Sequence, residues 1–392
     1  HLLIEGRTLV MTSGNRSEEP ICREPEEAFE RLGGIADAFL VHDRPIHVVC
    51  DDSVVRVFAD RELPLRRSRG YAPFPILLAK EAPSLLAVGA ELKSTFCLTQ
   101  GRRAFLSQHL GDLANVETLA AFERLVNHLT DLFRIEPQAV AADLHPAYLS
   151  TRFAERYAQE RGVPLVRVQH HHAHIAALLA EHGHSGREPV IGVSFDGTGY
   201  GTEGAIWGGE VLIADFARAE RFAHLAEVPL PGGDAAVRYP HRMALAHLRA
   251  AGIVWDPSLP PVAVASSTEL RILDRQLATG FATVRTTSMG RLFDAVASLV
   301  GLCHHAEFEG EAAMALEAAA SESVESPRYR FDLREAASAW VFDPAPLFAD
   351  LVADLARGFS VAHLSAHFHS AVALSIVDLS ERARTQTGIQ TV

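Results

Sequence analysis

The chain has 392 residues, of which 48% are hydrophobic and 22% charged, so it is long enough for two domains or for one large two-lobed fold. Its net charge of −13 excludes a nucleic-acid coat protein, and it shows neither a run of about 18 uncharged apolar residues nor a secretory signal. Four scattered cysteines without a CxxC pair exclude a zinc knuckle and a disulfide framework, so we expect a cytoplasmic protein whose partners include neither nucleic acid nor membrane.

Residues 1–62 are expected to form the tail of a truncated α/β domain. Strands are predicted in TLVMT and AFLVHD, with a helix in EPEEAFERL between them that stops at Gly33 and Gly34, and HDRPIHVVCDDSVVRVF is predicted to be extended. About 60 residues supply too little core for a separate domain. The opening on His1 and the close on TGIQTV likewise favour an internal fragment of a longer protein.

Residues 63–83 hold three prolines before Lys80 and a cluster of arginines, which predicts a linker or an extended strap. Residues 84–392 are expected to form a second domain. Its pattern begins with strand, turn, strand, turn and strand to residue 113 and continues with a helix near Val116–Phe133, a strand in AVAAD, a helix in LHPAYLSTRFAERYAQERG and a strand in PLVRVQ.

The segment PVIGVSFDGTGYGTEGAIWGGEVLIADF repeats the order of apolar strand, glycine-bearing turn and strand. Glycine turns let backbone N–H groups approach phosphate oxygens because no Cβ stands in the way. This weak repeat therefore predicts a duplicated α/β fold that cradles a nucleotide.

Four histidines fall within five positions of VQHHHAHIAALLAEHG, where a strand gives way to a predicted helix. His170 and His174 lie one helical turn apart and can bind the same metal ion, whereas His171 and His172 are expected to point elsewhere. Asp196, at the end of a predicted buried strand, offers a third ligand, and two nitrogens with one oxygen suit iron or zinc. The alternative is a polar helix start whose histidines are incidental.

Further candidates are positions where glycine or a lone charge suits a phosphate. Gly197, Thr198 and Gly199 follow Asp196 in a glycine turn, and Lys93 is one of only two lysines in the chain, although surface lysine is the simpler reading. Gly232, Gly233 and Asp234 form a proline-bounded loop, followed by two arginines, that could close on a phosphate-bearing substrate or merely connect two elements.

The stretch from Thr286 to Ala320 predicts two helices. A Ser-Met-Gly turn containing Gly290 opens the first, in which Asp294 lies off the apolar stripe, and Glu309 and Gly310 open the second. Acidic groups beside glycine turns could bind ribose hydroxyls, and the alternative is an ordinary helical hairpin.

These segments resemble the HypF carbamoyltransferase family. LVMTSGNRSEEPI, HDRPI and DDSVVR resemble the end of its YrdC-like domain. RRSRGYAPFP, AVGAELKSTFCL, VQHHHAHIAA, SFDGTGYG, LPGGDAAVRYPHRMAL, SMGRLFDAVASLVGL and FEGEAAMALE resemble, in that order, its TsaD/Kae-like domain. The resemblance implies an α/β fold with a YrdC-like tail and an actin/sugar-kinase-like (ASKHA, duplicated βββαβα) domain that lacks its C-terminal end.

The resemblance also implies an activity. Family members use ATP to convert carbamoyl phosphate into carbamoyl adenylate and pass the carbamoyl group to the C-terminal cysteine of HypE, for the cyanide ligands of [NiFe] hydrogenases. It implies nucleotide and carbamoyl-adenylate contacts at Ser13, Asn15 and Arg16, Mg²⁺ with the nucleotide, and a metal at His170, His174 and Asp196, which we take as the catalytic group.

Two alternatives stay open. One is a carbamoyltransferase that delivers to a sugar hydroxyl of an antibiotic, and the other is a non-catalytic ATP-binding regulator with the same ASKHA fold, which predicts no AMP release. Family members also carry an acylphosphatase domain and zinc-finger modules that this sequence lacks. We therefore expect the fragment alone to be inactive.

Overall fold

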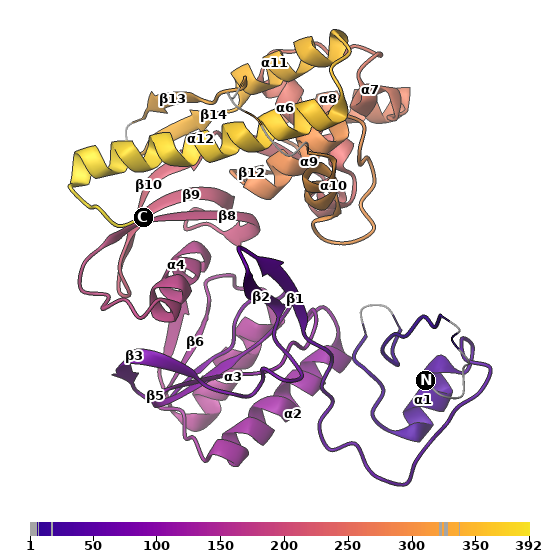
Figure 1. Cartoon of the computed structure of the whole chain (residues 1–392), viewed down its shortest axis with the longest axis vertical. Coiled ribbons are helices and arrows are strands. Elements are labelled where there is room, and N and C mark those ends of the chain that lie inside the picture. The colour runs from indigo at the N-terminus through magenta and orange to yellow at the C-terminus, as the bar shows by residue number, and fades with distance from the viewer. Residues whose placement is uncertain (1–5, 7, 17–18, 321–323, 325–327, 337) are drawn as a thin grey trace. The chain divides into compact units, whose positions relative to one another are not determined.

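The computed structural model describes every residue except 1–5, 7, 17–18, 321–323, 325–327 and 337. The chain divides into two units, residues 1–168 and residues 169–392, whose elements are labelled in Figure 1.

The first unit begins with helix α1 (Pro25–Leu32) and an antiparallel hairpin of β1 (Val54–Phe58) and β2 (Arg61–Arg66). The predicted helix is confirmed, because Gly33 follows its last residue. The strands expected in residues 8–12 and 38–43 are wrong, since the structure has no strand there. A strand needs a neighbour for its backbone hydrogen bonds, and apolar residues alone do not supply one.

A five-stranded sheet follows in the order β3-β5-β4-β6-β7. Its strands are β3 (Ile76–Ala82), β4 (Leu85–Ala87), β5 (Cys97–Leu106), β6 (Ala139–Asp143) and β7 (Leu165–Val168). Strands β4, β6 and β7 run parallel, while β5 is antiparallel to both β3 and β4.

Two expectations about this sheet need correction. Residues 63–83, expected to be a linker or an extended strap, are largely extended but belong to regular strands, because they include residues 63–66 of β2 and the whole of β3. The three strands expected over residues 84–113 are two, since β5 is continuous and the third place in the sheet belongs to β3. Pro73 and Pro75 precede β3 and so remove no hydrogen-bond donor from it.

Helices α2 (Val116–Phe133) and α3 (Leu149–Arg161) pack on this sheet. The predicted bounds of α2 are confirmed: Asn115 accepts a hydrogen bond from the Thr118 N–H at the start, and Arg134 ends the helix in a left-handed conformation. The ring of Phe122 contacts those of Phe96 and Phe153 edge-on, at centroid distances of 5.4 and 5.2 Å, in the buried core.

The second unit contains a seven-stranded sheet. Its order is β11-β12-β9-β10-β14-β13, and β8 pairs with β9. The strands are β8 (Val190–Tyr200), β9 (Ile206–Ala214), β10 (Ala219–Leu225), β11 (Val228–Pro231), β12 (Thr283–Thr286), β13 (Asp332–Glu335) and β14 (Trp340–Asp343). The antiparallel hairpins β4–β5 and β8–β9 confirm the predicted repeat of strand, turn and strand.

Nine described helices belong to this unit: α4 (His170–Glu181), α5 (Asp234–Arg238), α6 (Pro240–Ala250), α7 (Pro260–Ala263), α8 (Ser267–Thr279), α9 (Met289–Leu299), α10 (Glu311–Ala319), α11 (Ala345–Ala356) and α12 (Val361–Thr387). Neighbouring residues of a strand point to opposite faces of the sheet. Val190 accordingly packs against Ile175 of α4, whereas Ile191 joins the larger core that α6, α9, α11 and α12 line.

The glycine turn expected at residues 197–199 lies inside strand β8. The register of β8 against β9 shifts between Phe195 and Gly199, which marks a bulge, and the chain reverses later, where the Gly201 N–H donates to the Ala205 carbonyl. A bulge re-aims the side chains of a strand without ending its pairing. Asp196 thus stands within a strand and not at its end.

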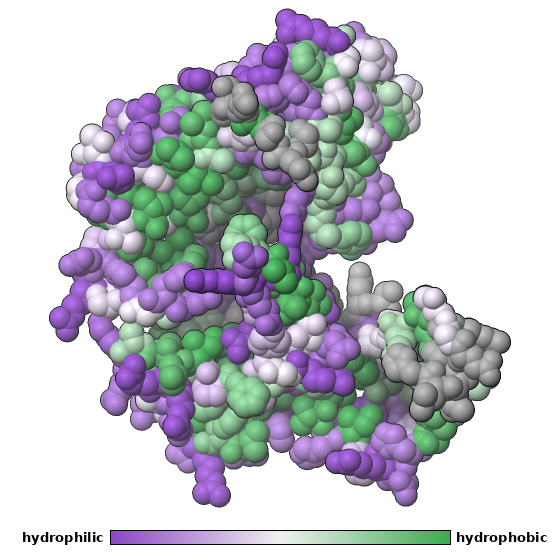
Figure 2. Space-filling view, in the orientation of Figure 1, coloured by the Kyte–Doolittle hydropathy of each residue, from purple (hydrophilic) through white to green (hydrophobic). Residues whose placement is uncertain are grey.

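Figure 2 shows hydrophilic and hydrophobic residues interspersed over the face in view. Isolated exposed apolar side chains such as Val254 are ordinary on protein surfaces. None of the described helices has both the length and the apolar character that crossing a bilayer requires.

The carboxylate of Asp354, in α11, makes several hydrogen bonds whose contribution to the stability of the second unit can be tested. Its carboxylate is 2% exposed and accepts hydrogen bonds from Arg328, from the Tyr329 hydroxyl and from Arg357. Asp354→Asn should lower the free energy of unfolding by about 2 kcal/mol, because charge-assisted bonds are lost and Arg328 keeps access to water. Chemical denaturation measures this, and Asp350→Asn, at an exposed position of the same helix, is the control.

The effect should depend on pH. Burial by itself would raise the pKa of Asp354, but the bonds from Arg357, Arg328 and Tyr329 outweigh it and hold the pKa below its usual range. A lowered folded pKa adds stability above the unfolded pKa of about 4, and this stability is lost as pH falls through the folded value. The gap between wild type and Asp354→Asn should therefore narrow below about pH 4, and a constant gap would contradict the assignment.

Candidate functional site

The first turn of α4 is fixed by Gln169. Its side-chain oxygen accepts a hydrogen bond from the His172 N–H at 2.9 Å, so the helix begins at His170. Because that bond settles which end of the amide is oxygen, the NH₂ end must be the donor to the Tyr200 carbonyl at 3.2 Å. The cap therefore ties the start of α4 to the end of β8.

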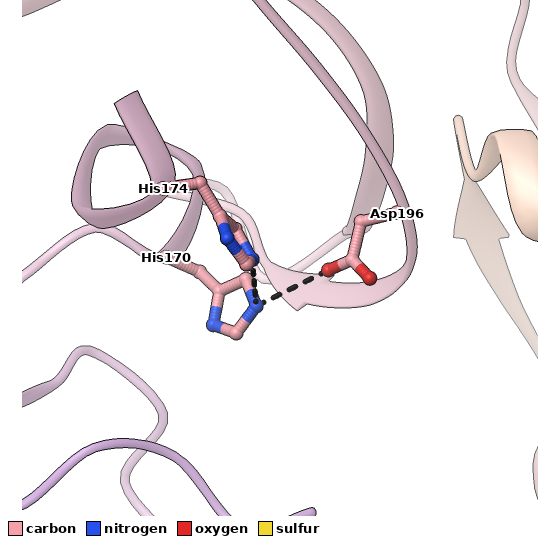
Figure 3. A group of neighbouring side chains, drawn as sticks. All are labelled: His170, His174 and Asp196. Atoms are coloured by element: carbon pink, nitrogen blue, oxygen red, sulfur yellow. Dashed lines mark hydrogen bonds and ion pairs between the residues drawn. The ribbon is translucent and has the colours of Figure 1, made fainter. Parts of the chain in front are cut away.

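His170, His174 and Asp196 converge between these two elements (Figure 3). The Nε2 atoms of the two imidazoles are 3.2 Å apart, and His170 Nε2 is 3.1 Å from Asp196 Oδ2. One ligand atom of each residue lies within 4.8 Å of the others. Ligands on an ion with bonds of about 2.1 Å stand roughly 3.0–3.4 Å apart. The two separations that involve His170 match this spacing, so the group is a candidate site for a divalent transition metal.

Asp196 is held by its own bulge. The Gly197 N–H donates to Oδ1 at 2.6 Å, while Oδ2 is buried and lacks a hydrogen bond of good geometry from the described residues. Burial by itself would raise the pKa of Asp196, but the contact with His170 and the charges of both imidazoles outweigh it and lower the pKa. The carboxylate is thus ionised and has one oxygen available for a cation.

His171 was expected to point away, and this is wrong. Its ring is fully buried, with Nε2 3.8 Å from Asp196 Oδ2. Its Nδ1 accepts from the Gln169 amide at 3.1 Å, which leaves the proton on Nε2, the atom that faces the carboxylate. Burial, with the charge of His170 adding to it, lowers the pKa of His171 to about 3, so the ring is neutral at ordinary pH. The expectation for His172 is confirmed, since its Nε2 bonds the Asp215 carbonyl at 2.7 Å.

Two glycines allow the close approach of these segments. A Cβ on Gly199 would lie 2.3 Å from Cε1 of His171 and 2.9 Å from Cδ2 of His170. A Cβ on Gly290, in the first turn of α9, would lie 2.7 Å from the Cα of Gly197. Gly197, Thr198, Gly199 and Gly290 therefore lie with the three candidate ligands.

Ser288 joins α9 to the bulge. Its hydroxyl lies 3.0 Å from the carbonyl oxygen of Asp196 and 2.7 Å from that of Gly197, and it accepts the N–H of Arg291 as the cap of α9. The first N–H groups of this helix consequently face the bulge, and a helix start of this kind favours an anion.

Asp294 is buried beside Arg291, with 2.7 Å between Oδ2 and the guanidinium Nε. Burial raises the pKa of Asp294, and the charge of Arg291 only partly opposes this. The buried pair favours a structural role over direct binding of a ribose. Arg291 reaches toward the bulge, since its Nη2 lies 3.9 Å from the place of a Cβ on Gly197.

The remaining candidates lie on other elements. Gly232 and Gly233 have φ values of +84° and +57° and precede Asp234, the first residue of α5. Glu309 is exposed, and Gly310, with φ +80°, opens α10 as predicted. These positions need glycine or an acidic helix start for local reasons, so the sequence pattern does not single out ligand binding there.

Lys93, Ser13, Asn15 and Arg16 belong to the first unit. Lys93 follows β4 with φ +48°, and its N–H donates to Asp112 at 2.7 Å. The Asn15 amide donates to the carbonyls of Arg16 and Glu19, and its oxygen is buried without a donor from the described residues.

Three family models match the chain. "Carbamoyltransferase, Kae1-like Domain, second subdomain" matches residues 192–392, "HypF Kae1-like domain" matches residues 80–181, and the Sua5, YciO and YrdC family, described as "Telomere recombination", matches residues 1–68. The first alone accounts for half of the chain.

The chain is 48% identical to "Carbamoyltransferase HypF2" of Cupriavidus necator over 332 residues, 81% of this chain and 39% of that protein. It is 38% identical to "Carbamoyltransferase HypF" of Synechocystis over 415 residues, 100% of this chain and 52% of that protein, so it spans about half or less of these relatives. "Crystal structure of full-length HypF in the phosphate- and nucleotide-bound form" superposes with a TM-score of 0.90 at 43% identity and covers 99% of this chain and 60% of that one. The chain therefore belongs to the HypF carbamoyltransferase family.

Proposed function

We propose that this chain performs the transfer steps of an ATP-dependent carbamoyltransferase that acts on the C-terminal cysteine of HypE. Water first releases phosphate from carbamoyl phosphate to leave carbamate; a carbamate oxygen then attacks the α-phosphorus of ATP, and pyrophosphate leaves as carbamoyl adenylate forms. The carbamoyl group passes from the adenylate to the cysteine. The observation that carries the proposal is the convergence of His170, His174 and Asp196 beside backbone that is open to a phosphate. We place ATP, with Mg²⁺ on its phosphates, along residues 197–199 and the first turn of α9.

The chemistry requires a good leaving group. A carbamoyl carbon is a poor electrophile because nitrogen donates into the carbonyl, and linkage to AMP remedies this. The cysteine thiolate forms the new S–C bond, the C–O bond to AMP breaks, and AMP leaves with the electron pair. The partner supplies the nucleophile, so this chain has to bind, orient and shield the adenylate.

Each residue has a defined task in this proposal. Bound iron or zinc would supply a Lewis acid for a phosphate or carbonyl oxygen, held by His170, His174 and Asp196. Gly197 and the exposed Thr198 leave the backbone accessible, Gly199 makes room for the imidazoles of His170 and His171, and Arg291, kept in place by Asp294, stands beside Gly197. Gly232, Gly233, Asp234, Glu309 and Gly310 remain proposed contacts of this nucleotide, and Lys93 is a proposed phosphate contact within the first unit.

The first unit carries the proposed earlier site at Ser13, Asn15 and Arg16. The Asn15 oxygen, to which no described residue donates, suits a carbamoyl N–H group, because a buried acceptor without a donor costs free energy. Carbamoyl phosphate and ATP are the proposed substrates there.

Acceptor chemistry separates this function from its alternatives. In the full-length protein that contains this chain, carbamoyl phosphate and ATP should yield a peptide carrying one carbamoyl group when the peptide ends in cysteine, and none when it ends in serine. Mass spectrometry of the peptide and measurement of AMP provide the readout. Transfer to a sugar hydroxyl but not to cysteine would favour the antibiotic-modifying reading, and ATP binding without AMP release would favour a regulator.

His174→Ala tests the metal group directly. It removes one of three protein ligands and should weaken Zn²⁺ binding by more than the roughly 10–100-fold that changes around a ligand set usually cost. Elemental analysis and competition with a chromophoric chelator measure this. His172→Ala is the matched control, since that imidazole bonds the Asp215 carbonyl instead; equal Zn²⁺ affinity in both variants would refute the site.

Gly199→Ala and Gly197→Ala form a second matched pair. The Cβ at residue 199 must displace the imidazoles of His170 and His171, whereas the nearest atom to a Cβ at residue 197 is 3.9 Å away. We expect Gly199→Ala to lower Zn²⁺ affinity about tenfold or more and Gly197→Ala to leave it near wild type. A Gly199→Ala protein with wild-type affinity would contradict the proposed geometry.

A further inference from the structure

Glu210 of β9 is a fully buried carboxylate that is bonded on both oxygens. Oε1 accepts from the Thr287 hydroxyl at 2.5 Å and lies 3.3 Å from the Gly208 N–H, and Oε2 accepts from Arg221 at 2.6 Å. A buried charge is costly unless it is paired and hydrogen-bonded, so this arrangement must be maintained throughout the folded state.

Gly208 and Thr287, the two uncharged hydrogen-bond donors to Glu210, lie next to the backbone of the candidate metal ligand Asp196. A Cβ on Gly208 would lie 2.5 Å from the Asp196 carbonyl oxygen, so the two backbones are in close contact. Thr287 precedes Ser288, whose hydroxyl is within hydrogen-bond distance of the Asp196 carbonyl. One carboxylate thus links β9 and the start of α9, the two segments that confine the β8 bulge.

Arg221 balances the charge of Glu210. Its guanidinium lies over the ring of Trp207 at 4.0 Å, and that ring is 6.0 Å from the ring of His171. Trp207 is in turn bonded through its N–H to Glu203 at 3.1 Å. Glu210 therefore acts in a network that reaches the buried imidazole as well as the carboxylate.

We propose that Glu210 is a positioning residue for the metal group: by accepting hydrogen bonds from Thr287 and Gly208 it fixes the β8 bulge so that the Asp196 carboxylate stays directed at His170 and His174. This inference rests on the proposed function, since it presumes that these three residues bind a divalent ion. Groups that orient ligands from outside the ligand set commonly alter metal affinity by about 10–100-fold.

Two double variants separate positioning from charge balance. Glu210→Gln with Arg221→Met keeps an acceptor for Thr287 and Gly208 while removing both charges. Glu210→Met with Arg221→Met removes the charges and the acceptor together. The probe is Co²⁺, whose visible absorption reports ligand geometry, titrated at a temperature where circular dichroism shows each protein to be folded.

The Gln/Met protein should bind Co²⁺ close to wild type, whereas the Met/Met protein should bind it about tenfold more weakly or worse, with a changed visible spectrum. Wild-type affinity and spectrum in a folded Met/Met protein would overturn the inference. If Met/Met does not fold, Thr287→Val removes one donor at nearly constant volume, and a wild-type Co²⁺ spectrum there would overturn it equally.

A separate variant tests the proposed metal site itself, independently of Glu210. His174→Ala in the same titration should abolish the Co²⁺ spectrum. If it does not, the metal group itself is refuted, whatever Glu210 does. If it does, and the double variants behave alike, only the positioning role of Glu210 fails.

Discussion

The arrangement of the second unit depends on the ionised carboxylate of Asp196, which is half-buried and has its Oδ2 atom shielded from water. One of its oxygens is satisfied by the Gly197 N–H, and the other faces two imidazoles. Removing a carboxylate from water costs several kcal/mol unless positive or hydrogen-bonding groups replace the solvent. The start of α4 and the bulge of β8 supply the groups that meet that requirement, and the cap of α9 holds the backbone of the bulge.

The three segments can meet only because their contact surfaces are almost bare backbone. Gly199 admits the two imidazoles, and Gly290 brings α9 against Gly197. With larger side chains at these positions the helices would stand farther from the sheet, and the ligand atoms could not lie within 4.8 Å of one another. Hydrogen bonds from the side chains of Gln169 and Ser288 then hold the segments at that short distance.

Local patterns in the sequence predict part of the fold and part of the candidate site. The bounds of α2 follow from an Asn cap and an apolar period of 3.6, and the pairing of His170 with His174 follows from their spacing of one turn. Strand β3 and the network of Glu210 could not be predicted in this way. Strand β3 pairs with a strand that is not its immediate neighbour in the chain, and Thr287 lies 77 residues from Glu210, so a single sequence does not show which segments will meet. The direction of His171 likewise depends on a bulge that periodicity does not reveal.

The carboxylates of Asp196, in β8, and Glu210, in β9, have different roles because their surroundings differ. The side chain of Glu210 is fully buried, and its charge is neutralised by Arg221, so it has little attraction left for a cation. The side chain of Asp196 is 26% exposed, and its neighbours are imidazoles, which are themselves metal ligands. In the proposed function, a divalent ion approaching this hairpin would therefore be directed to Asp196, because the pairing of Glu210 with Arg221 removes the carboxylate that would otherwise compete for it.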